Sequence, residues 1–194
     1  MNTRTRVALI TGGATGLGRA MAERLAADGM RIVIGDLRGA QEAVQAIQDQ
    51  HGVDCLGLHM DVTDAVSIQE TVDAAASRFG GIDVLVNNAA LFSTLVNRPF
   101  DQYDAEEWMQ VMRVNTLGPF LCAKAVAPHM KRQRWGRIIN VASTSALKGL
   151  ANMAHYVTSK GAVITFTRVL ARELGAWEIT ANAIAPGLTL SDQI

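Results

Sequence analysis

The chain has 194 residues, of which 49% are hydrophobic and 19% are charged, and its 18 basic and 18 acidic side chains balance. This length and composition suit one globular domain with enough apolar residues to cover both faces of a sheet. The zero net charge and the lack of any basic run exclude the electrostatic footprint of a nucleic-acid-binding protein.

Short apolar runs alternate with amphipathic runs along the chain. The apolar runs predict six strands, at Arg6–Ile10, Arg31–Gly35, Val53–His59, Ile82–Val86, Arg137–Val141 and Ile179–Ile184. The amphipathic runs predict helices at Leu17–Asp28, Ala40–Gln50, Asp64–Phe79, Ala105–Gln133 and Met153–Leu174. Asp64 is placed to cap its helix, and the stretch 105–133 is expected to be interrupted near Gly118-Pro119. A glycine is expected to end four of the helices: Gly29, Gly52, Gly80 and Gly175.

Strands that alternate with helices predict parallel pairing through right-handed crossovers. This is the α/β, Rossmann-like, doubly wound architecture, in which ligands bind beyond the carboxyl ends of the strands. We therefore expect a single dinucleotide-binding domain over residues 1–194.

A glycine-rich segment, Thr11–Gly18, joins the first predicted strand to the first predicted helix. Gly12 can allow the tight turn off the strand, Gly16 can let backbone approach a pyrophosphate, and Gly18 can allow close packing of the helix on the sheet. The helix that follows would aim free N–H groups at the phosphates. Such a turn alone is weak support for a nucleotide site, but its place between a buried strand and a helix favours a dinucleotide.

Polar residues also follow later strands. Asp36 lies roughly 20 residues past the glycines, where an acid meets the adenosine ribose hydroxyls. A carboxylate there would repel a ribose 2′-phosphate, and only Arg38 nearby could offset it, so we predict NAD(H) rather than NADP(H). Asp61-Val62 could hold the adenine edge, and Asn87–Ala90 follows the fourth strand. Taken singly, each is also typical of an ordinary turn.

Tyr156 and Lys160 lie four residues apart and therefore on one face of a predicted helix. An ammonium group near a phenol favours the phenolate and lowers the tyrosine pKa from about 10. Tyr156 could then take the proton of an alcohol while hydride leaves its carbon, or donate to a carbonyl oxygen in reverse. An isolated pair of this kind is more often a surface pair on a helix.

Two further residues change that balance. Ser143 ends the fifth strand, and its hydroxyl can donate to a substrate oxygen, although Thr144 and Ser145 are near rivals. Asn115 lies inside a helical stretch, where asparagine is a poor helix former, so a local bend or a bound water is expected. The alternative is an exposed polar helix residue. Together the motifs indicate hydride transfer between a nicotinamide and an alcohol or carbonyl.

These ordered motifs resemble those of the short-chain dehydrogenase/reductase family over essentially the whole chain. They are TGxxxGxG at Thr11–Gly18, the acid Asp36, Asp61-Val62, an NNAG-like Asn87–Ala90, Asn115, Ser143, YxxxK at Tyr156–Lys160, and Pro186-Gly187. The resemblance implies a catalytic tetrad of Asn115, Ser143, Tyr156 and Lys160, in which Lys160 also binds the nicotinamide ribose and Asn115 holds a water of a proton relay. It implies NAD contacts at Gly12, Thr15, Gly16, Leu17, Gly18, Asp36, Leu37, Asp61, Val62, Asn88, Ala89, Ala90, Tyr156, Lys160, Pro186, Gly187, Leu188 and Thr189.

Two departures from the family pattern bear on the site. Ala90 stands where glycine is usual and could shift the loop near the nicotinamide ribose. Relatives also continue past the Pro186-Gly187 turn with a substrate-covering lid and a last strand, which these 194 residues lack. We expect the sequence to report part of a longer chain, because a sheet ending at six strands would leave apolar surface uncovered.

The expected substrate wall is mostly apolar and comprises Leu91, Phe92, Ser145, Leu147, Met153 and His155. This suggests a hydrophobic or cyclic secondary alcohol, or its ketone, as substrate, with His155 more simply a partly exposed helix residue. Surplus apolar residues at 117–130 and 154–174 predict a homo-oligomer, since relatives form dimers within tetramers through these two helices.

No segment has the character of a signal peptide or a membrane span, so we expect a cytoplasmic protein with no membrane partner. Cys55 and Cys122 lack metal-ligand spacing, and the four histidines are scattered, which argues against a metal site. The leading hypothesis is an NAD-dependent oxidoreductase. The alternative is a non-catalytic NAD-binding module of the same fold without a closed pocket.

Overall fold

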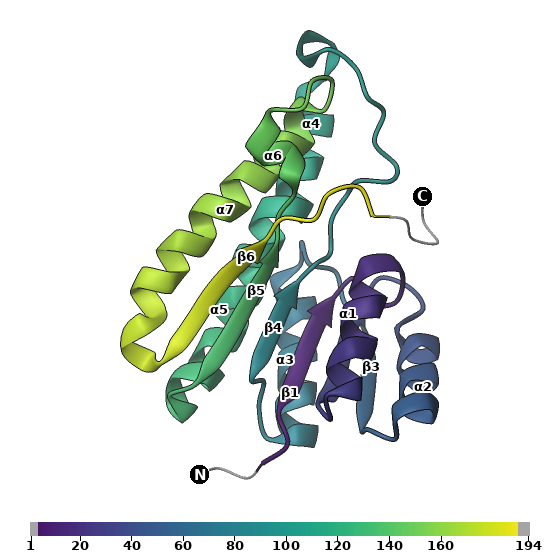
Figure 1. Cartoon of the computed structure of the whole chain (residues 1–194), viewed down its shortest axis with the longest axis vertical. Coiled ribbons are helices and arrows are strands. Elements are labelled where there is room, and N and C mark those ends of the chain that lie inside the picture. The colour runs from purple at the N-terminus through teal and green to yellow at the C-terminus, as the bar shows by residue number, and fades with distance from the viewer. Residues whose placement is uncertain (1–3, 190–194) are drawn as a thin grey trace.

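The computed structural model describes residues 4–189, and six parallel strands form one sheet in the order β3-β2-β1-β4-β5-β6 (Figure 1). The strands are β1 (Val7–Thr11), β2 (Arg31–Asp36), β3 (Cys55–His59), β4 (Val84–Asn87), β5 (Gly136–Val141) and β6 (Ile179–Ile184). Every neighbouring pair is parallel, with Leu9 of β1 opposite Val33 on one side and Leu85 on the other. The predicted Rossmann-like, doubly wound sheet is confirmed.

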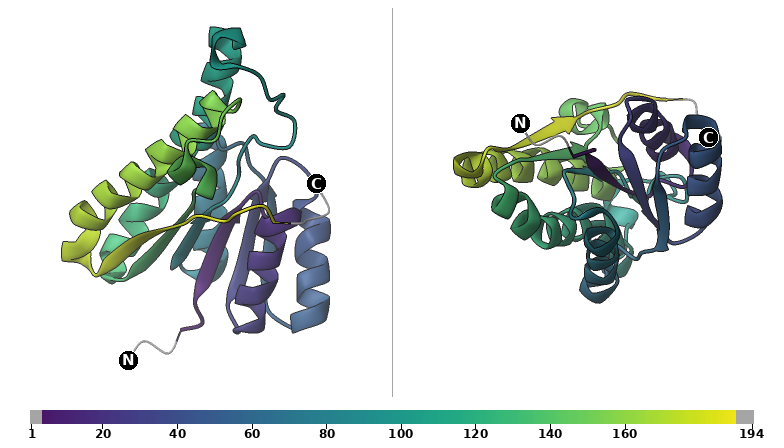
Figure 2. Two further views of the ribbon diagram at one scale, coloured as in Figure 1. Left: turned by 45° about the horizontal axis from the view of Figure 1, so that its top comes forward. Right: turned by 90° about the horizontal axis from the view of Figure 1, so that it is seen from below.

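Helices cover both faces of the sheet (Figure 2). Ala8 and Ile10 of β1 pack in one core with α1 (Gly16–Ala27) and α2 (Ala40–His51). Val7 and Leu9 face the opposite core, which contains α3 (Ala65–Phe79), α5 (Gly118–Gln133) and α7 (Ala154–Leu174). Successive strand residues point to opposite faces, so apolar residues throughout a strand supply both cores.

Short elements complete the chain and refine one expectation. The helical stretch 105–133 is interrupted earlier than expected, by a π turn, η2 (Arg113–Leu117), between α4 (Ala105–Met112) and α5, whereas Pro119 sits in the first turn of α5, where proline is tolerated. α7 ends at Leu174 with Gly175 as its C-cap, as expected, but Gly175 has right-handed backbone: the chain continues through η3 (Gly175–Trp177), and Glu178 takes the left-handed conformation. The remaining elements, η1 (Phe100–Gln102) and α6 (Thr144–Lys148), were not expected from the sequence.

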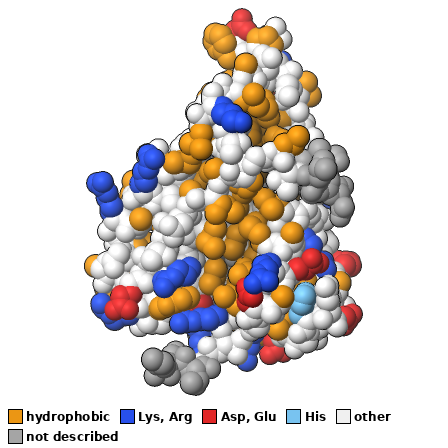
Figure 3. Space-filling model, in the orientation of Figure 1, with side chains coloured by type: hydrophobic (Ala, Val, Ile, Leu, Met, Phe, Trp, Pro, Cys, Tyr) orange, Lys and Arg blue, Asp and Glu red, His pale blue; other side chains and the backbone are white. Residues whose placement is uncertain are grey.

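One half of the sheet lacks a helix on the face that carries α1 and α2. Within residues 4–189, no helix lies over β5 and β6 on this face (Figures 1 and 2), and Trp135 and Ile139 remain only partly buried there. Figure 3 shows a band of hydrophobic side chains running down this side of the molecule. This surface agrees with the expectation that a six-stranded sheet leaves apolar residues uncovered.

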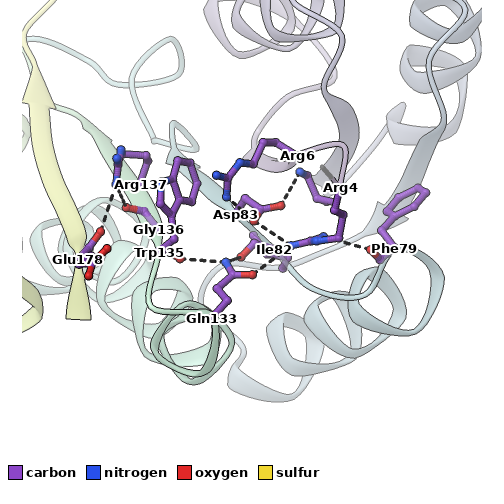
Figure 4. A network of polar contacts seen from close by, with 11 residues as sticks. Arg4, Arg6, Phe79, Ile82, Asp83, Gln133, Trp135, Gly136, Arg137 and Glu178 are labelled. Carbon is purple, nitrogen blue, oxygen red and sulfur yellow. Dashed lines mark hydrogen bonds and ion pairs between the residues drawn. The ribbon is translucent and has the colours of Figure 1, made fainter. Parts of the chain in front are cut away.

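A polar network ties the amino ends of the strands together, at the edge away from the predicted site (Figure 4). Asp83, which is fully buried, accepts hydrogen bonds from Arg4 at 2.8 Å and Arg6 at 3.2 Å through one oxygen. Its other oxygen accepts the backbone N–H of Val7 at 2.8 Å. Since every charge in this group has a partner, the network secures β1 against β4 and leaves the carboxyl edge to bind ligands.

Candidate active site

A cleft of about 600 Å³ runs along the carboxyl ends of the strands. The ends of all six strands and the loops that follow them contribute to its wall: residues 12, 15, 17 and 18 after β1, 36–37 at the end of β2, 60–62 after β3, 88–93 after β4, 142–145 after β5 and 186–189 after β6. A doubly wound sheet places its ligand site at this edge.

The glycine-rich turn after β1 brings two loops and one helix into close contact. Gly12 and Gly16 have left-handed backbone, with φ of 62° and 55°, which glycine adopts without strain. A Cβ on Gly12 would lie 2.8 Å from the Cα of Ala89, and one on Gly18 would overlap the Gly12 carbonyl oxygen and the Asn88 amide. Gly18 therefore permits contact with these loops rather than with the sheet itself, and the start of α1 can present its unpaired N–H groups to the cleft.

The loops after β1 and β4 are joined by hydrogen bonds. Asn88 donates its side-chain amide to the carbonyls of Thr11 and Gly12, at 3.0 and 2.8 Å. The Thr11 hydroxyl accepts the backbone N–H groups of Asn88 and Ala89, each at 3.0 Å. Asn88 thus lines the cleft, and its side-chain N–H groups link the loop after β4 to the loop after β1. Ala90 is exposed on the cleft and has no left-handed backbone, so its methyl group is accommodated.

Two carboxylates lie at the β2 and β3 end of the cleft. Asp36 accepts the N–H of Ala14 at 3.0 Å and that of Arg38 at 3.3 Å, one on each oxygen. Asp61 accepts both the N–H and the hydroxyl of Thr63 through a single oxygen, at 2.8 and 2.7 Å. These bonds fix both carboxylates at the cleft wall and leave acceptor capacity for sugar or base hydroxyl and amine groups.

These features fit a nicotinamide dinucleotide. The glycine cradle has no room for a Cβ, the start of α1 suits a pyrophosphate, and the carboxylate of Asp36 suits ribose hydroxyls. Every predicted cofactor residue except Gly16 lines the cleft; Gly16 lies directly beside it, at the first residue of α1.

Tyr156, Lys160 and Ser143 meet at the β5 side of the cleft. Tyr156 and Lys160 lie on the first turns of α7 and are 8% and 3% exposed, so the alternative of a surface pair is excluded. Ser143, the residue that precedes α6, accepts hydrogen bonds from the N–H and hydroxyl of Ser145, at 3.2 and 2.9 Å. The Ser143 hydroxyl can therefore donate its own proton toward the side of the cleft that holds Tyr156, and Ser145 supports Ser143 rather than replacing it.

The electrostatics of this group differ from the expectation in one respect. Burial lowers the pKa of the Lys160 ammonium to about 8, and its Nζ donates to the Val141 carbonyl at 2.8 Å. Burial also raises the pKa of Tyr156, and a hydrogen bond with Ser143 offsets this only in part. The expected lowering of the Tyr156 pKa by Lys160 is wrong for the protein alone, because desolvation dominates and the group that lowers this pKa is Ser143; the Lys160 Nζ lies 5.8 Å from the ring centre.

Asn115 is completely buried, which excludes the alternative of an exposed helix residue. It lies in the π turn η2, so the expected bend is present. Its side chain accepts the N–H of Leu91 at 2.8 Å and donates to the Leu91 carbonyl at 3.2 Å and to the Ser159 hydroxyl at 3.1 Å. Asn115 does not line the cleft; it ties the loop after β4 to α7. Ser159, which the sequence reasoning missed, in turn donates to the Tyr156 carbonyl at 2.7 Å.

The substrate side of the cleft is mostly apolar, as expected. Leu91, Phe92, Ser145 and Met153 line it, and the ring of Phe92 lies 4.9 Å from that of Tyr156. Leu147 and His155 do not line it: Leu147 is 68% exposed, and His155 is 1% exposed rather than partly exposed. Three lining residues, Ser93, Lys148 and Leu150, carry no motif that would have singled them out in the sequence.

The fold and cleft define a dinucleotide-binding α/β protein, and comparisons with known proteins agree. The family model described as short chain dehydrogenase matches residues 6–193, and the chain belongs to this family. The 3-oxoacyl-[acyl-carrier-protein] reductase FabG of Escherichia coli K12 is 37% identical over 193 residues, which are 99% of this chain and 77% of that protein.

Two solved structures have the same fold. An NAD+-bound xylitol dehydrogenase superposes with a TM-score of 0.90 at 36% identity, covering 96% of this chain and 72% of that one. A 3-ketoacyl-(acyl-carrier-protein) reductase from Brucella melitensis, complexed with NADH, gives a TM-score of 0.91 at 33% identity, covering 98% and 78%. Oxidoreductase chemistry on a carbonyl or alcohol with a nicotinamide cofactor follows from this membership.

Proposed function

We propose that this chain transfers a hydride between NAD(H) and a secondary alcohol or its ketone, with Tyr156 as general acid and base. The observation that carries the proposal is the meeting of Tyr156, Ser143 and Lys160 at one side of the cleft whose other side holds the glycine cradle and Asp36. A protein that only bound NAD would need the glycine cradle and Asp36, but not Tyr156, Ser143 and Lys160 together.

Each residue has a role that follows from its contacts. The Ser143 hydroxyl accepts from Ser145 and lies within hydrogen-bond reach of Tyr156, so it can donate its proton to a substrate oxygen bound beside the Tyr156 hydroxyl. Tyr156 removes the alcohol proton in oxidation and returns it to the carbonyl oxygen in reduction. A bound nicotinamide would supply the hydride chemistry, and the positive charge of its oxidised form would favour ionised Tyr156. Lys160 adds a second positive charge and can bind the nicotinamide ribose.

The proposed cofactor is NAD(H) rather than NADP(H), because Asp36 presents its carboxylate where the ribose hydroxyls would bind. The relatives crystallised with NAD+ and with NADH are consistent with this preference. Steady-state kinetics with both cofactors, repeated with Asp36→Ala, tests it. We expect the wild type to favour NAD(H) and the variant to lose that preference. A wild type that favours the phosphorylated cofactor would contradict the assignment.

The proposed substrates are hydrophobic or cyclic secondary alcohols, because Leu91, Phe92, Leu150 and Met153 form the wall beside Tyr156. The test incubates the protein with NAD+ and a panel of such alcohols and follows absorbance of the reduced nicotinamide. Tyr156→Phe should abolish turnover while leaving NADH binding intact. Cofactor binding without turnover of any panel member would favour the alternative, a non-catalytic NAD-binding module.

We also propose a homo-oligomer. Leu117, Phe120 and Val169 are each more than two-fifths exposed, and Phe120 packs edge-on against Phe166 of α7. A hollow of about 350 Å³ lies beside them, lined by Met109, Met112, Arg113, Thr116, Leu117 and Phe120. Light scattering at micromolar concentration should give a multiple of 20.8 kDa, and Phe120→Lys should reduce it. A monomeric wild type would refute this part of the proposal.

A cytoplasmic location fits the same proposal, since Cys55 and Cys122 are both unpaired. Across residues 4–189, no helix combines the length and the apolar character that crossing a bilayer requires.

A further inference from the structure

A cluster of side chains outside the cleft holds the beginning of α7, the helix that carries Tyr156. It consists of Arg98 and Tyr103 from the segment after β4, Glu107 from α4, and His155 from α7. In Figure 1, α4, α6 and the start of α7 lie together at one end of the molecule. We propose that His155 is a positioning residue that fixes the backbone of Tyr156, and that Glu107 and Tyr103 hold the His155 ring for this purpose. The inference rests on the proposed function.

The first step of the argument is the helix end itself. A helix leaves its first N–H groups without partners, and a side chain before the helix commonly accepts one of them. Met153 occupies that position before α7, and its side chain has no group that can accept such a hydrogen bond. His155 supplies the missing acceptor from within the first turn: its Nδ1 accepts the backbone N–H of Tyr156 at 2.8 Å.

The second step is the orientation of the ring. Because Nδ1 accepts a hydrogen bond, the ring proton is on Nε2. This nitrogen is buried, has no hydrogen-bond partner, and lies 3.6 Å from a carboxylate oxygen of Glu107. Arg98 holds the same oxygen at 2.9 Å, and the Tyr103 ring stacks on the imidazole with centres 4.1 Å apart. The carboxylate therefore favours the tautomer that the cap needs.

The third step concerns the chain that leads into α7. Asn152 has left-handed backbone, with φ of 63°. Its carbonyl accepts the Tyr103 hydroxyl at 2.8 Å and the Arg98 N–H at 3.0 Å. The same cluster thus fixes Asn152, two residues before the helix, and the His155 ring inside the first turn.

The result is that both backbone polar groups of Tyr156 are held by side chains. His155 accepts its N–H, and Ser159, itself bonded to Asn115, donates to its carbonyl. A phenol that must meet a substrate oxygen within hydrogen-bond distance gains from this arrangement, because small displacements of a reacting group cost large factors in rate. His155 touches neither cleft nor substrate, so its effect passes through Tyr156.

Three substitutions separate the cap from other roles of the ring. Asparagine can place an acceptor near the position of Nδ1, glutamine reaches only toward Nε2, and leucine has neither. We expect His155→Leu and His155→Gln to lower kcat about tenfold or more. The kcat of His155→Asn should stay within about threefold of the wild type, because asparagine retains most of the helix cap. The dissociation constant of NADH should change less than about twofold in all three. The control is His51→Leu, which removes a half-buried histidine from the end of α2, away from the cleft.

A second readout needs no turnover. Hydrogen exchange of the Tyr156 amide, measured in the protein without substrate or cofactor, should be faster in His155→Leu and His155→Gln than in the wild type and His155→Asn. Equal kcat and equal amide exchange in the Asn and Gln variants would overturn the proposal, even if the Leu variant does not fold. A wild type that binds NADH but oxidises no alcohol would refute the proposed function instead, and the amide exchange would still decide the role of His155.

Discussion

The burial of Lys160 has a measurable consequence for stability. Its side chain is 3% exposed, and burial moves the pKa of the ammonium from 10.5 to about 8. One pKa unit corresponds to about 1.4 kcal/mol, so holding the charged form inside the folded protein costs about 3 kcal/mol at pH 7. The free energy of unfolding is reduced by this amount below pH 8, where Lys160 is protonated in both states.

The sign of the pH effect follows from the proton balance. Between pH 8 and pH 10.5 the folded protein has lost the Lys160 proton while the unfolded chain still holds it, so the unfolded state binds more protons and stability rises with pH. For these two pKa values the gain in the free energy of unfolding between pH 7 and pH 10 is roughly 2–3 kcal/mol.

The assay compares the wild type with Lys160→Met by urea unfolding at several pH values between 7 and 10. The variant removes the cost of burying the charge, about 3 kcal/mol, and also the hydrogen bond to the Val141 carbonyl, worth roughly 1.5–3 kcal/mol. The two proteins should therefore have similar stability at pH 7, whereas the wild type should become more stable than the variant by roughly 2–3 kcal/mol at pH 10. Other titrating groups, Tyr156 included, are present in both proteins and largely cancel.

A matched control is Lys124→Met, which removes an exposed lysine from α5 over the same pH range. The variant at Lys160 should also lose alcohol oxidation by at least about a hundredfold, since it lacks the second positive charge near Tyr156. If the free energies of unfolding of the wild type and Lys160→Met run parallel from pH 7 to pH 10, then Lys160 is not desolvated in the folded protein and the reasoning fails.

Three further outcomes are expected. Gly18→Ala should weaken NADH binding at least about tenfold in a fluorescence titration, because the new methyl overlaps the Gly12 carbonyl. The control Gly175→Ala, whose methyl meets nothing within 4 Å, should bind NADH normally. Equal NADH affinities of the two variants would disprove the role of the glycine cradle. Asp83→Asn should cost about 3 kcal/mol and lower Tm by about 6–12 °C, since Arg4 and Arg6 lose a buried partner; a loss under about 1 kcal/mol would mean that the network adds little. Iodoacetamide at pH 8 should leave Cys122 unmodified in the native protein, because burial raises the pKa of its thiol to about 12, and rapid labelling seen by mass spectrometry would contradict this.

The strands and most helices could be predicted because their signals are local. The continuous apolar runs at Val7–Thr11 and Arg31–Asp36 identify buried parallel strands, and Asp64 caps α3 through the N–H of Val66, as its position predicted. A bend at Asn115 could be predicted from the sequence, but its π-helical form could not. Asn115 bonds to Leu91 and Ser159, which lie far from it in the sequence. The end of α7 at Leu174 was predicted correctly, although Gly175 keeps right-handed helical backbone and Glu178 makes the left-handed turn after η3.

The site was predictable in its membership and less so in its electrostatics. Spacing along the chain identifies Tyr156 and Lys160 as neighbours, since residues four apart share a helix face. Spacing carries no information on desolvation, which depends on the packed surroundings and decides the direction of both pKa shifts. For the same reason, His155 could be assigned a place on the helix but not its burial against Tyr103 and Glu107.

The two edges of the sheet have different roles: the amino edge stabilises the fold, and the carboxyl edge carries the candidate active site. The carboxyl edge has a desolvated ammonium at Lys160, left-handed backbone at Asn152 and a π turn at Asn115, whereas the left-handed residues Arg134 and Glu178 precede β5 and β6 at the amino edge. Also at the amino edge, Asp83 and its two arginines form a satisfied network beside β1 and β4. Strained and desolvated groups persist only where the surrounding fold enforces them, so the carboxyl edge depends on the rest of the sheet remaining folded. Asp83→Asn is therefore expected to lower the melting temperature without changing kcat in the folded enzyme, whereas Lys160→Met is expected to lower kcat at nearly constant stability at pH 7.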